Sequence, residues 1–267
     1  MDVQKINVNG RTIEYFSFGH GKKTMVILPG LSIQSVMLSK DAVAEAYNIL
    51  SDEFTVYLFE RPVTLPPVYT VYDSARDTAE AFRLLGLQDI CLFGVSMGGM
   101  IAQVIACRYP EMIHKMIIGS TTARISEERS EALSEWVSAA RAHDPLRLCL
   151  GFGEAVYPPE MFKMYTDYLK TMAAGITDAE LDRFSVQAEG TRGFDITPEL
   201  DKISCPVYLI EAADDAVLGP DAHLSITSKL GKRSDFCFYM YEEGYGHAAY
   251  DTAPDYKQRI LDFFTAE

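Results

Sequence analysis

The segment Ile90-Cys91-Leu92-Phe93-Gly94-Val95-Ser96-Met97-Gly98-Gly99 is the most informative part of this chain about its fold. Residues 90–94 are apolar on both faces, which is typical of a buried strand in a parallel sheet. Residues 97–109 have a helical pattern that stops before Pro110. A strand that becomes a helix within one residue brings the positions two before and two after Ser96 close together, and only small residues fit there. We therefore predict that Ser96 adopts a strained backbone conformation with its hydroxyl raised above the sheet.

The same alternation of strands and helices extends along most of the chain. A hairpin is indicated first, because two alternating runs, 3–8 and 12–16, flank the turn Asn9-Gly10. Further strands are predicted at 24–28, 55–59, 116–119, 207–210 and 236–241, and further helices at 73–85, 221–230 and 254–264. This order predicts an α/β fold with a doubly wound, mostly parallel sheet.

One segment breaks the alternation. Residues 126–143, 160–174 and 178–190 have helical patterns with no strand between them. We therefore expect a core made of residues 1–121 and 196–267, interrupted by a helical insertion at 122–195. Apolar side chains recur at helical spacing in the insertion, and we expect most of them to form its own core and a few to face a pocket. They are Met161, Phe162, Tyr165, Leu169 and Met172, with Tyr157 and Tyr168 nearby.

Composition excludes several classes of function. The 267 residues are 48% hydrophobic and 23% charged, as in an ordinary globular protein, and the net charge of −14 disfavours binding to nucleic acids or anionic membranes. The N-terminus has no apolar signal region, and no apolar run reaches 18 residues. The five cysteines are spread singly, so we expect free thiols, no metal site and a cytoplasmic location. We also expect no cofactor.

Ser96 needs a base before its hydroxyl can act as a nucleophile. Of the five histidines, His247 lies in the glycine loop Gly244-Tyr245-Gly246-His247, between the last strand and the last helix. In a parallel sheet this loop opens at the same carboxyl edge as Ser96. A base of this kind needs a carboxylate to fix its tautomer, and both Asp214 and Asp215 follow the strand at 207–210 on that edge. The residues themselves leave these two aspartates as alternatives.

The turn around Ser96 and the chain order serine, aspartate, histidine resemble the α/β-hydrolase superfamily. Within it, the Ser-Met-Gly-Gly turn is similar to those of capped carboxylesterases, enol-lactonases and C–C-bond hydrolases. The resemblance implies that the insertion is a cap. It also implies that Asp215 is the acid, since Ala212 then occupies the place of the family's glycine in Gly-x-x-Asp, with Asp214 as the alternative.

The resemblance further implies an oxyanion hole made by two backbone amides, those of Met97 and Leu31. Leu31 lies in the loop Leu28-Pro29-Gly30-Leu31-Ser32, where Pro29 replaces the histidine that is usual in the family. One segment departs from the family pattern, because residues 59–67 contain no glycine where the family has a glycine-rich loop. In that segment Arg61 is expected to form a structural salt bridge, with an acidic group of a substrate as the alternative partner.

These residues together predict a serine hydrolase that cleaves a small carboxylic ester or lactone through an acyl-enzyme on Ser96. Two alternatives stay open. One is hydrolysis of an activated C–C bond, such as that of a vinylogous diketone, with the same three residues. The other is a small-ligand receptor on a hydrolase fold. The expected partner is a small molecule, and no pattern in the sequence specifies an oligomeric state.

Overall fold

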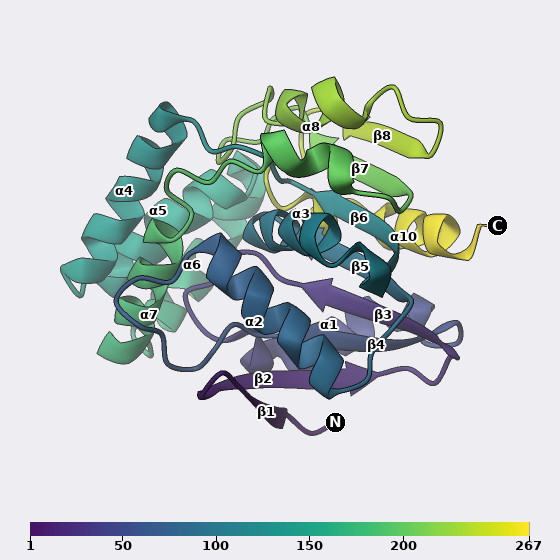
Figure 1. The fold of residues 1–267 in the computed structure, drawn as a ribbon. Coiled ribbons are helices and arrows are strands. Elements are labelled where there is room, and N and C mark those ends of the chain that lie inside the picture. Colours follow the sequence, from purple (N-terminus) through teal and green to yellow (C-terminus); the bar gives the residue numbers. More distant parts are fainter. Residues whose placement is uncertain (267) are drawn as a thin grey trace.

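A single mostly parallel sheet forms the centre of the protein (Figure 1). The computed structural model describes residues 1–266 and all of their side chains except that of Ala132. The strands in this part of the chain are β1 (Gln4–Val8), β2 (Arg11–Phe18), β3 (Lys23–Leu28), β4 (Phe54–Phe59), β5 (Ile90–Val95), β6 (Ile113–Gly119), β7 (Val207–Ala212) and β8 (Phe236–Tyr241). Their order is β1-β2-β4-β3-β5-β6-β7-β8, with β2 antiparallel to both neighbours and all other pairs parallel. The predicted doubly wound fold is confirmed.

Helices follow most of the strands. The α-helices are α1 (Lys40–Ala46), α2 (Val71–Leu84), α3 (Met97–Arg108), α4 (Glu127–Arg141), α5 (Pro145–Val156), α6 (Pro159–Ala173), α7 (Asp178–Glu189), α8 (Leu224–Leu230), α9 (Ala249–Thr252) and α10 (Tyr256–Thr265). Short 3₁₀ turns occur as η1 (Val36–Ser39), η2 (Asn48–Leu50), η3 (Pro110–Met112) and η4 (Thr197–Lys202). None of the helices between residues 1 and 266 is both long enough and apolar enough to cross a membrane.

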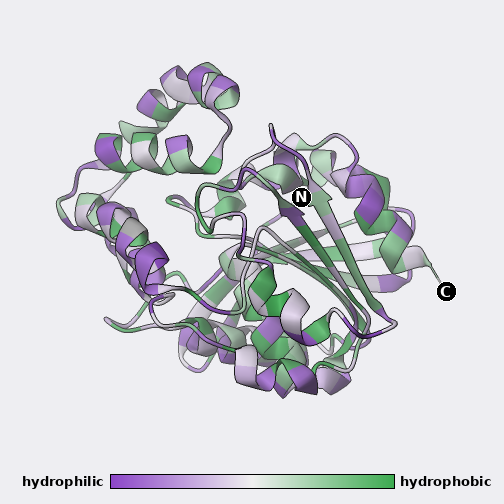
Figure 2. Ribbon diagram, turned by 90° about the horizontal axis from the view of Figure 1, so that it is seen from above, coloured by the Kyte–Doolittle hydropathy of each residue, from purple (hydrophilic) through white to green (hydrophobic). Residues whose placement is uncertain are grey.

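The two faces of the sheet bury separate apolar layers. Alternate residues of β3 show the division, because Val26 and Leu28 belong to the apolar cluster that includes residues of α2, α3 and α8, while Met25 and Ile27 belong to the cluster that includes residues of η2 and α10. Figure 2 shows the strands mostly in the colours of hydrophobic residues, with purple concentrated on the helices. A sheet covered on both faces explains why its central strands are apolar at every position.

Local signals account for the first elements. Asn9 and Gly10 both have positive φ, 50° and 78°, as the predicted two-residue hairpin turn requires, and β1 pairs with β2 in register around them. Helix α2 begins with a capping box in which Thr70 and Asp73 each accept a hydrogen bond from the backbone of the other. It ends at Leu84, and Gly86, which follows the C-cap residue Leu85, has the positive φ of 68° that is typical after a helix end, as predicted.

The insertion contains four helices, α4 to α7, which gather at one end of the sheet (Figure 1). They share an apolar core that includes Leu148, Leu181 and Phe184, and Ile33, from the loop after β3, belongs to the same core. Three of the helices correspond to the predicted patterns, but α5 was missed because Gly151 and Gly153 interrupt its apolar pattern. Its start was visible in the sequence, since Asp144 caps the helix and proline follows at the first helical position.

The backbone segments that enter and leave the four-helix segment, around Arg124 and Asp195, lie side by side. Arg124 and Asp195 form an isolated antiparallel bridge there. Hydrogen bonds on both sides of the bridge join the two passages, from the Ile125 amide to the Phe194 carbonyl and from the Ile196 amide to the Ala123 carbonyl, each 2.9 Å long. The two backbone connections between the four-helix segment and the sheet core are therefore paired with each other at this point.

Candidate active site

Ser96 occupies the sharp turn between β5 and α3. Its φ of 53° and ψ of −123° lie in a region that side-chain-bearing residues rarely adopt. The turn is possible because a Cβ at Gly94 would collide with the Gly98 carbonyl oxygen, and a Cβ at Gly98 would collide with the Leu28 carbonyl oxygen. The predicted strain at Ser96 is therefore present, and the glycines around it are required by close backbone contact.

A continuous line of hydrogen bonds connects Ser96, His247 and Asp215. His247 Nε2 lies 2.9 Å from Ser96 Oγ, and His247 Nδ1 lies 2.8 Å from Asp215 Oδ2. The three residues follow β5, β8 and β7 respectively, so the carboxyl edge of the sheet brings them together across 151 residues of sequence. In this arrangement the imidazole can take the hydroxyl proton while the carboxylate holds the ring in one tautomer.

The two neighbouring aspartates have different contacts. The second oxygen of the buried Asp215, Oδ1, accepts hydrogen bonds from the amides of Val217 and Leu218, at 2.8 and 2.9 Å. Burial alone raises the pKa of Asp215, but His247 and these two amides outweigh it and hold the pKa below its usual value. Of the two aspartates, Asp215 is therefore the one that contacts His247.

Asp214 contacts the backbone of a loop instead of the imidazole. Its carboxylate accepts hydrogen bonds from the amides of Gly244 and Gly246, at 2.8 and 2.9 Å. These glycines belong to the loop that carries His247. Asp214 therefore fixes the loop, while Asp215 fixes the ring.

The amides of Leu31 and Met97 are free to act as hydrogen-bond donors. Neither donates a hydrogen bond to the described part of the chain, and both residues line the cavity that contains Ser96. The loop lies close to the serine, because a Cβ at Gly30 would be 3.1 Å from Ser96 Cβ. Met97 is also the first residue of α3, where the helix dipole favours negative charge.

A buried ionic network lies behind this loop. Arg61 donates to the Pro29 carbonyl at 3.0 Å, to Ser32 Oγ at 3.3 Å and to Gln187 Oε1 of α7 at 2.9 Å. Its Nε is also 3.2 Å from Glu60 Oε1. Arg61 thus forms the structural salt bridge that we expected, and it holds the loop on both sides of Leu31.

Glu60 is the centre of the same network, and sequence reasoning did not single it out. Its carboxylate accepts from the Val36 amide at 3.0 Å and from Arg183 of α7 at 3.1 Å. Burial raises the pKa of Glu60, but the two arginines and the backbone donors outweigh burial and hold the pKa below its usual value. The available signal was an acidic and a basic residue side by side at the end of an apolar strand.

A second unexpected acid, Glu211, lies at the end of β7. It is buried, and its Oε1 accepts from the Thr121 amide at 3.1 Å. Burial raises the pKa of Glu211 well above its usual value, and the nearby charge of Asp215 adds to the rise. The carboxyl of Glu211 therefore holds its proton to higher pH than an exposed glutamate does, whereas Asp215, with its lowered pKa, favours the charged form beside His247.

A cavity of about 440 Å³ opens above Ser96. Its floor contains Ser96, His247 and the loop at Leu31, and its roof comes from α4, α5 and α6. Of the predicted apolar residues of the insertion, Tyr157, Tyr168, Leu169 and Met172 line this cavity, whereas Phe162 and Tyr165 pack on the core of the four helices.

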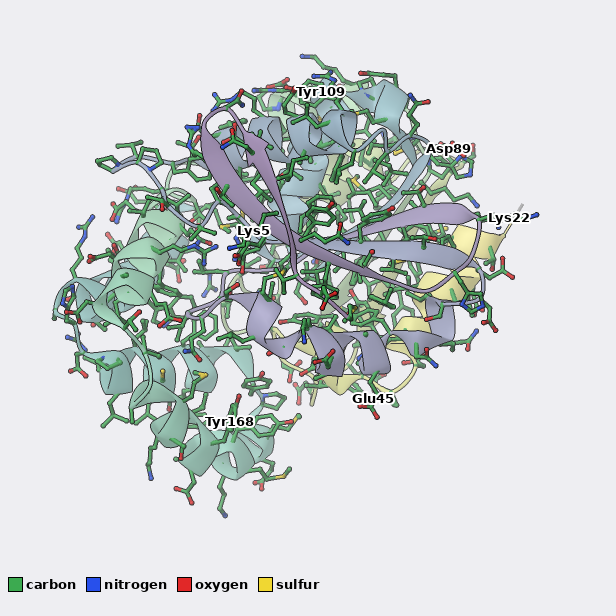
Figure 3. All side chains as sticks on the ribbon, turned by 90° about the horizontal axis from the view of Figure 1, so that it is seen from below. Lys5, Lys22, Glu45, Asp89, Tyr109 and Tyr168 are labelled. Atoms are coloured by element: carbon green, nitrogen blue, oxygen red, sulfur yellow. The ribbon has the colours of Figure 1, made fainter. Side chains whose placement is uncertain are left out.

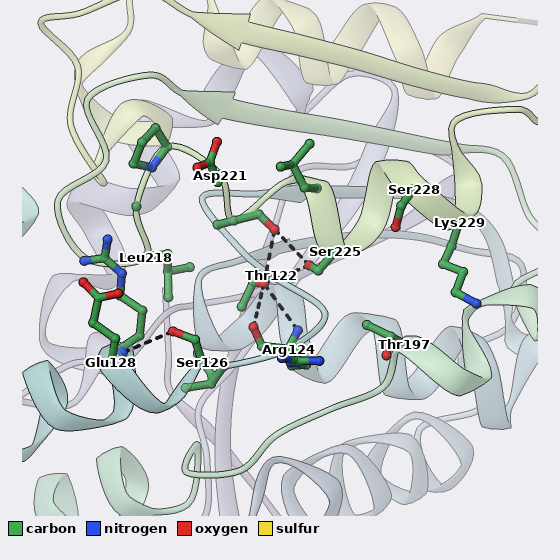
Figure 4. A pocket seen from close by; sticks show the side chains of 16 residues that line it. Thr122, Arg124, Ser126, Glu128, Thr197, Leu218, Asp221, Ser225, Ser228 and Lys229 are labelled. Carbon is green, nitrogen blue, oxygen red and sulfur yellow. Dashed lines mark hydrogen bonds between the residues drawn. The ribbon is translucent and has the colours of Figure 1, made fainter.

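A separate groove of about 590 Å³ lies between the start of α4 and α8 (Figure 4). Thr122 ties its base together, since its hydroxyl contacts the carbonyls of Arg124 and Ala222 and the hydroxyl of Ser225. None of Ser96, His247 and Asp215 lines this groove. Within residues 1–266 we find no group of three or more His, Cys, Asp or Glu side chains arranged to hold a metal ion.

A serine on a strained turn after the fifth strand, with a histidine after the last strand of a sheet in this order, defines the class of α/β hydrolases. The sequence model of the alpha/beta hydrolase family matches residues 25–256. The chain belongs to this family.

Individual relatives are distant in sequence but similar in length and shape. The serine hydrolase BPHL of Mus musculus is 24% identical over 97% of this chain and 85% of its own length. Among solved structures, MGS-M2, an alpha/beta hydrolase from a deep-sea metagenome library, superposes with a TM-score of 0.87 at 19% identity, covering 99% of this chain and 98% of its own. The enol-lactonase of Burkholderia xenovorans LB400 gives 0.82 at 18% identity, covering 98% and 100%.

Proposed function

We propose that the protein is a serine hydrolase that cleaves a small carboxylic ester or lactone through an acyl-enzyme on Ser96. One observation carries the proposal. Ser96 Oγ, the two ring nitrogens of His247 and Asp215 Oδ2 form a hydrogen-bonded line with separations of 2.9 and 2.8 Å. This geometry is suited to proton transfer from a hydroxyl to an imidazole, and a serine needs it before it can attack a carbonyl.

Each group has a defined part in the reaction. His247 takes the proton of Ser96 as its oxygen attacks the carbonyl carbon, and Asp215 stabilises the resulting imidazolium. The amides of Leu31 and Met97 stabilise the negative oxygen of the tetrahedral intermediate. His247 then passes the proton to the leaving oxygen, and a water molecule activated by the same imidazole releases the acyl group.

We propose that residues 122–195 act as a cap over the core formed by residues 1–121 and 196–267. The backbone pairing at Arg124 and Asp195 supports these borders, and the roof that α4, α5 and α6 form over Ser96 supports the role. A small-molecule substrate would then bind between cap and core. We also propose a cytoplasmic location, which the five unpaired cysteines support.

A panel of p-nitrophenyl esters, lactones and vinylogous diketones, with wild type and Ser96→Ala, tests this function. We expect ester or lactone turnover that falls by several orders of magnitude in Ser96→Ala, and labelling by a fluorophosphonate that the same variant abolishes. Ser39→Ala is the matched control, because Ser39 lines the same cavity without contacting His247, and it should keep both properties. Turnover of the diketone alone would favour the C–C hydrolase, and turnover slower than one ligand per many minutes would favour a receptor.

A further inference from the structure

The cavity above Ser96 has an uncharged lining within the described part of the chain. Among residues 1–266, no Asp, Glu, Lys or Arg lines it, although 23% of the residues of the chain are charged. Apart from His247, the polar side chains there belong to Ser, Thr, Gln, Tyr and Trp. A site built for a charged substrate normally includes at least one group of opposite charge, because a buried ion without a partner is costly.

Two arginines in the network behind the cavity, Arg61 and Arg183, are already bound to protein groups. The guanidinium of Arg61 is used by Pro29, Ser32, Gln187 and Glu60. That of Arg183 is bound to Glu60 and to the carbonyl oxygens of residues 61 and 62. Neither arginine lines the cavity. A substrate carboxylate in the cavity would therefore find no cation, and the net charge of −14 would add repulsion.

The polar groups that do line the cavity are neutral. Burial raises the pKa of Tyr157 to about 12, so its hydroxyl stays protonated at any working pH. Tyr250 also lines the cavity, and burial raises its pKa as well. Gln34 directs its amide nitrogen to Glu180, 3.4 Å away, and Ser32 accepts a hydrogen bond from Arg61. These groups fit a neutral oxygen acceptor better than an anion.

The mouth of the cavity is apolar as well. Leu38 of η1 is 71% exposed and Tyr168 of α6 is 66% exposed, and both line the cavity. Tyr168, on the helical insertion, is labelled in Figure 3. Exposed apolar side chains at a cavity entrance provide a surface along which an apolar chain can extend.

We propose that the natural substrate is uncharged, with an apolar acyl group, and that the enzyme discriminates against esters and lactones that carry a carboxylate on the acyl chain. This inference rests on the ester hydrolysis proposed above and adds the substrate class. Because an unpaired carboxylate in such a cavity costs several kcal/mol, discrimination should reach about 100-fold or more in kcat/KM.

Three esters with one leaving group test the proposal on the wild-type protein. They are p-nitrophenyl hexanoate, mono-p-nitrophenyl adipate and the methyl ester of the latter, which has a similar chain without the charge. We expect the kcat/KM of the adipate monoester to be about 100-fold or more below that of hexanoate, and that of the methyl ester to lie within about 5-fold of hexanoate. Equal kcat/KM for adipate and hexanoate would overturn the inference and leave the proposed function intact. No Ser96-dependent turnover of any of the three would overturn the proposed function itself.

A charge placed in the cavity gives a second test. Met172 of α6 lines the cavity, so Met172→Lys should raise the kcat/KM of the adipate monoester relative to hexanoate by about 10-fold or more. Met164 lies on the same helix, is 72% exposed and does not line the cavity, so Met164→Lys should leave the ratio unchanged. The same change of ratio in both variants would count against the inference, because it would reflect the general field of the protein.

Discussion

Replacing Arg61 by methionine tests whether the buried network positions the oxyanion loop. The substitution removes hydrogen bonds to the Pro29 carbonyl and to Ser32 Oγ, which lie on either side of Leu31. Loss of one oxyanion donor costs about 10²–10³ in kcat, and a displacement of about 1 Å costs about 10². Because Arg61 positions the Leu31 amide without itself donating to the oxyanion, we expect kcat to fall by about 10- to 100-fold. KM should change by less than about 3-fold, since the cavity walls remain.

The stability change can be worked out separately. Breaking a buried ion pair by removing one partner costs about 3–5 kcal/mol. In Arg61→Met the carboxylate of Glu60 keeps Arg183 at 3.1 Å and the Val36 amide at 3.0 Å, so we expect the lower end, about 3 kcal/mol. This corresponds to a fall in Tm of roughly 6–12 °C for a chain of this size.

Arg183→Met is the matched control. It removes the other cation beside Glu60 and should cost a similar amount of stability, but Arg183 makes no hydrogen bond to the loop at residues 29–32. We would measure kcat, KM and the inhibition constant of an aryl trifluoromethyl ketone, well below the Tm of both variants. The inhibitor forms an oxyanion with Ser96, so its inhibition constant should rise in parallel with the loss of kcat in Arg61→Met alone. Equal losses of kcat in both variants would refute the positioning role and leave Arg61 as a stabilising residue only.

Three further predictions follow from the site and its surroundings. Asp215→Asn should lower kcat by about 10³–10⁴, because Asp215 contacts the imidazole of His247. Asp214→Asn should lower kcat by only about 10-fold, because Asp214 contacts only the loop that carries His247. Equal losses of kcat in a steady-state assay would contradict this division. Burial raises the pKa of folded Glu211 above the usual 4.5 of the unfolded glutamate, so wild-type stability falls as pH rises above 4.5. Glu211→Gln should therefore raise Tm at pH 8 by at least about 2 °C more than at pH 5, and parallel plots of Tm against pH for the two proteins would refute this. In the native protein only the exposed Cys237 should react rapidly with a thiol reagent at pH 8, because burial raises the pKa of the other four thiols to about 11 or 12. All five thiols should react after denaturation. More than one rapid thiol in the native state, or fewer than five in the denatured state, would contradict the expectation.

Much of the fold could be predicted because its signals are local. The Asn9-Gly10 turn, the apolar strands and the glycines around Ser96 each depend on neighbours a few residues away. Positive φ at a hairpin turn and backbone crowding at a strand–helix turn restrict the residue types that fit, so the sequence itself reveals them. Helix α5 was not predicted for the same reason, because two glycines interrupt the local apolar pattern from which helices were predicted.

The candidate site was partly predictable for a topological reason. In a parallel sheet the carboxyl ends of all strands lie at the same edge. Ser96, Asp215 and His247 each follow a strand, so they could be expected to lie together at that edge. The sequence order left Asp214 and Asp215 as alternatives, because adjacent residues in a loop point in different directions and only the folded loop decides which one meets the imidazole.

The sheet, the strained serine turn and the loops at the carboxyl edge of the strands could thus be inferred from the amino-acid order alone. The network of Glu60, Arg61 and Gln187, the raised pKa of Glu211 and the lack of charged side chains among the described residues that line the cavity above Ser96 all depend on tertiary packing. Arg61 and Gln187 are 126 residues apart, and Glu211 and Thr121 are 90 apart, so no local pattern records either contact. Whether a buried polar group is paired, neutral or exposed to a ligand depends on the packing of distant segments, and this packing exists only in the folded chain.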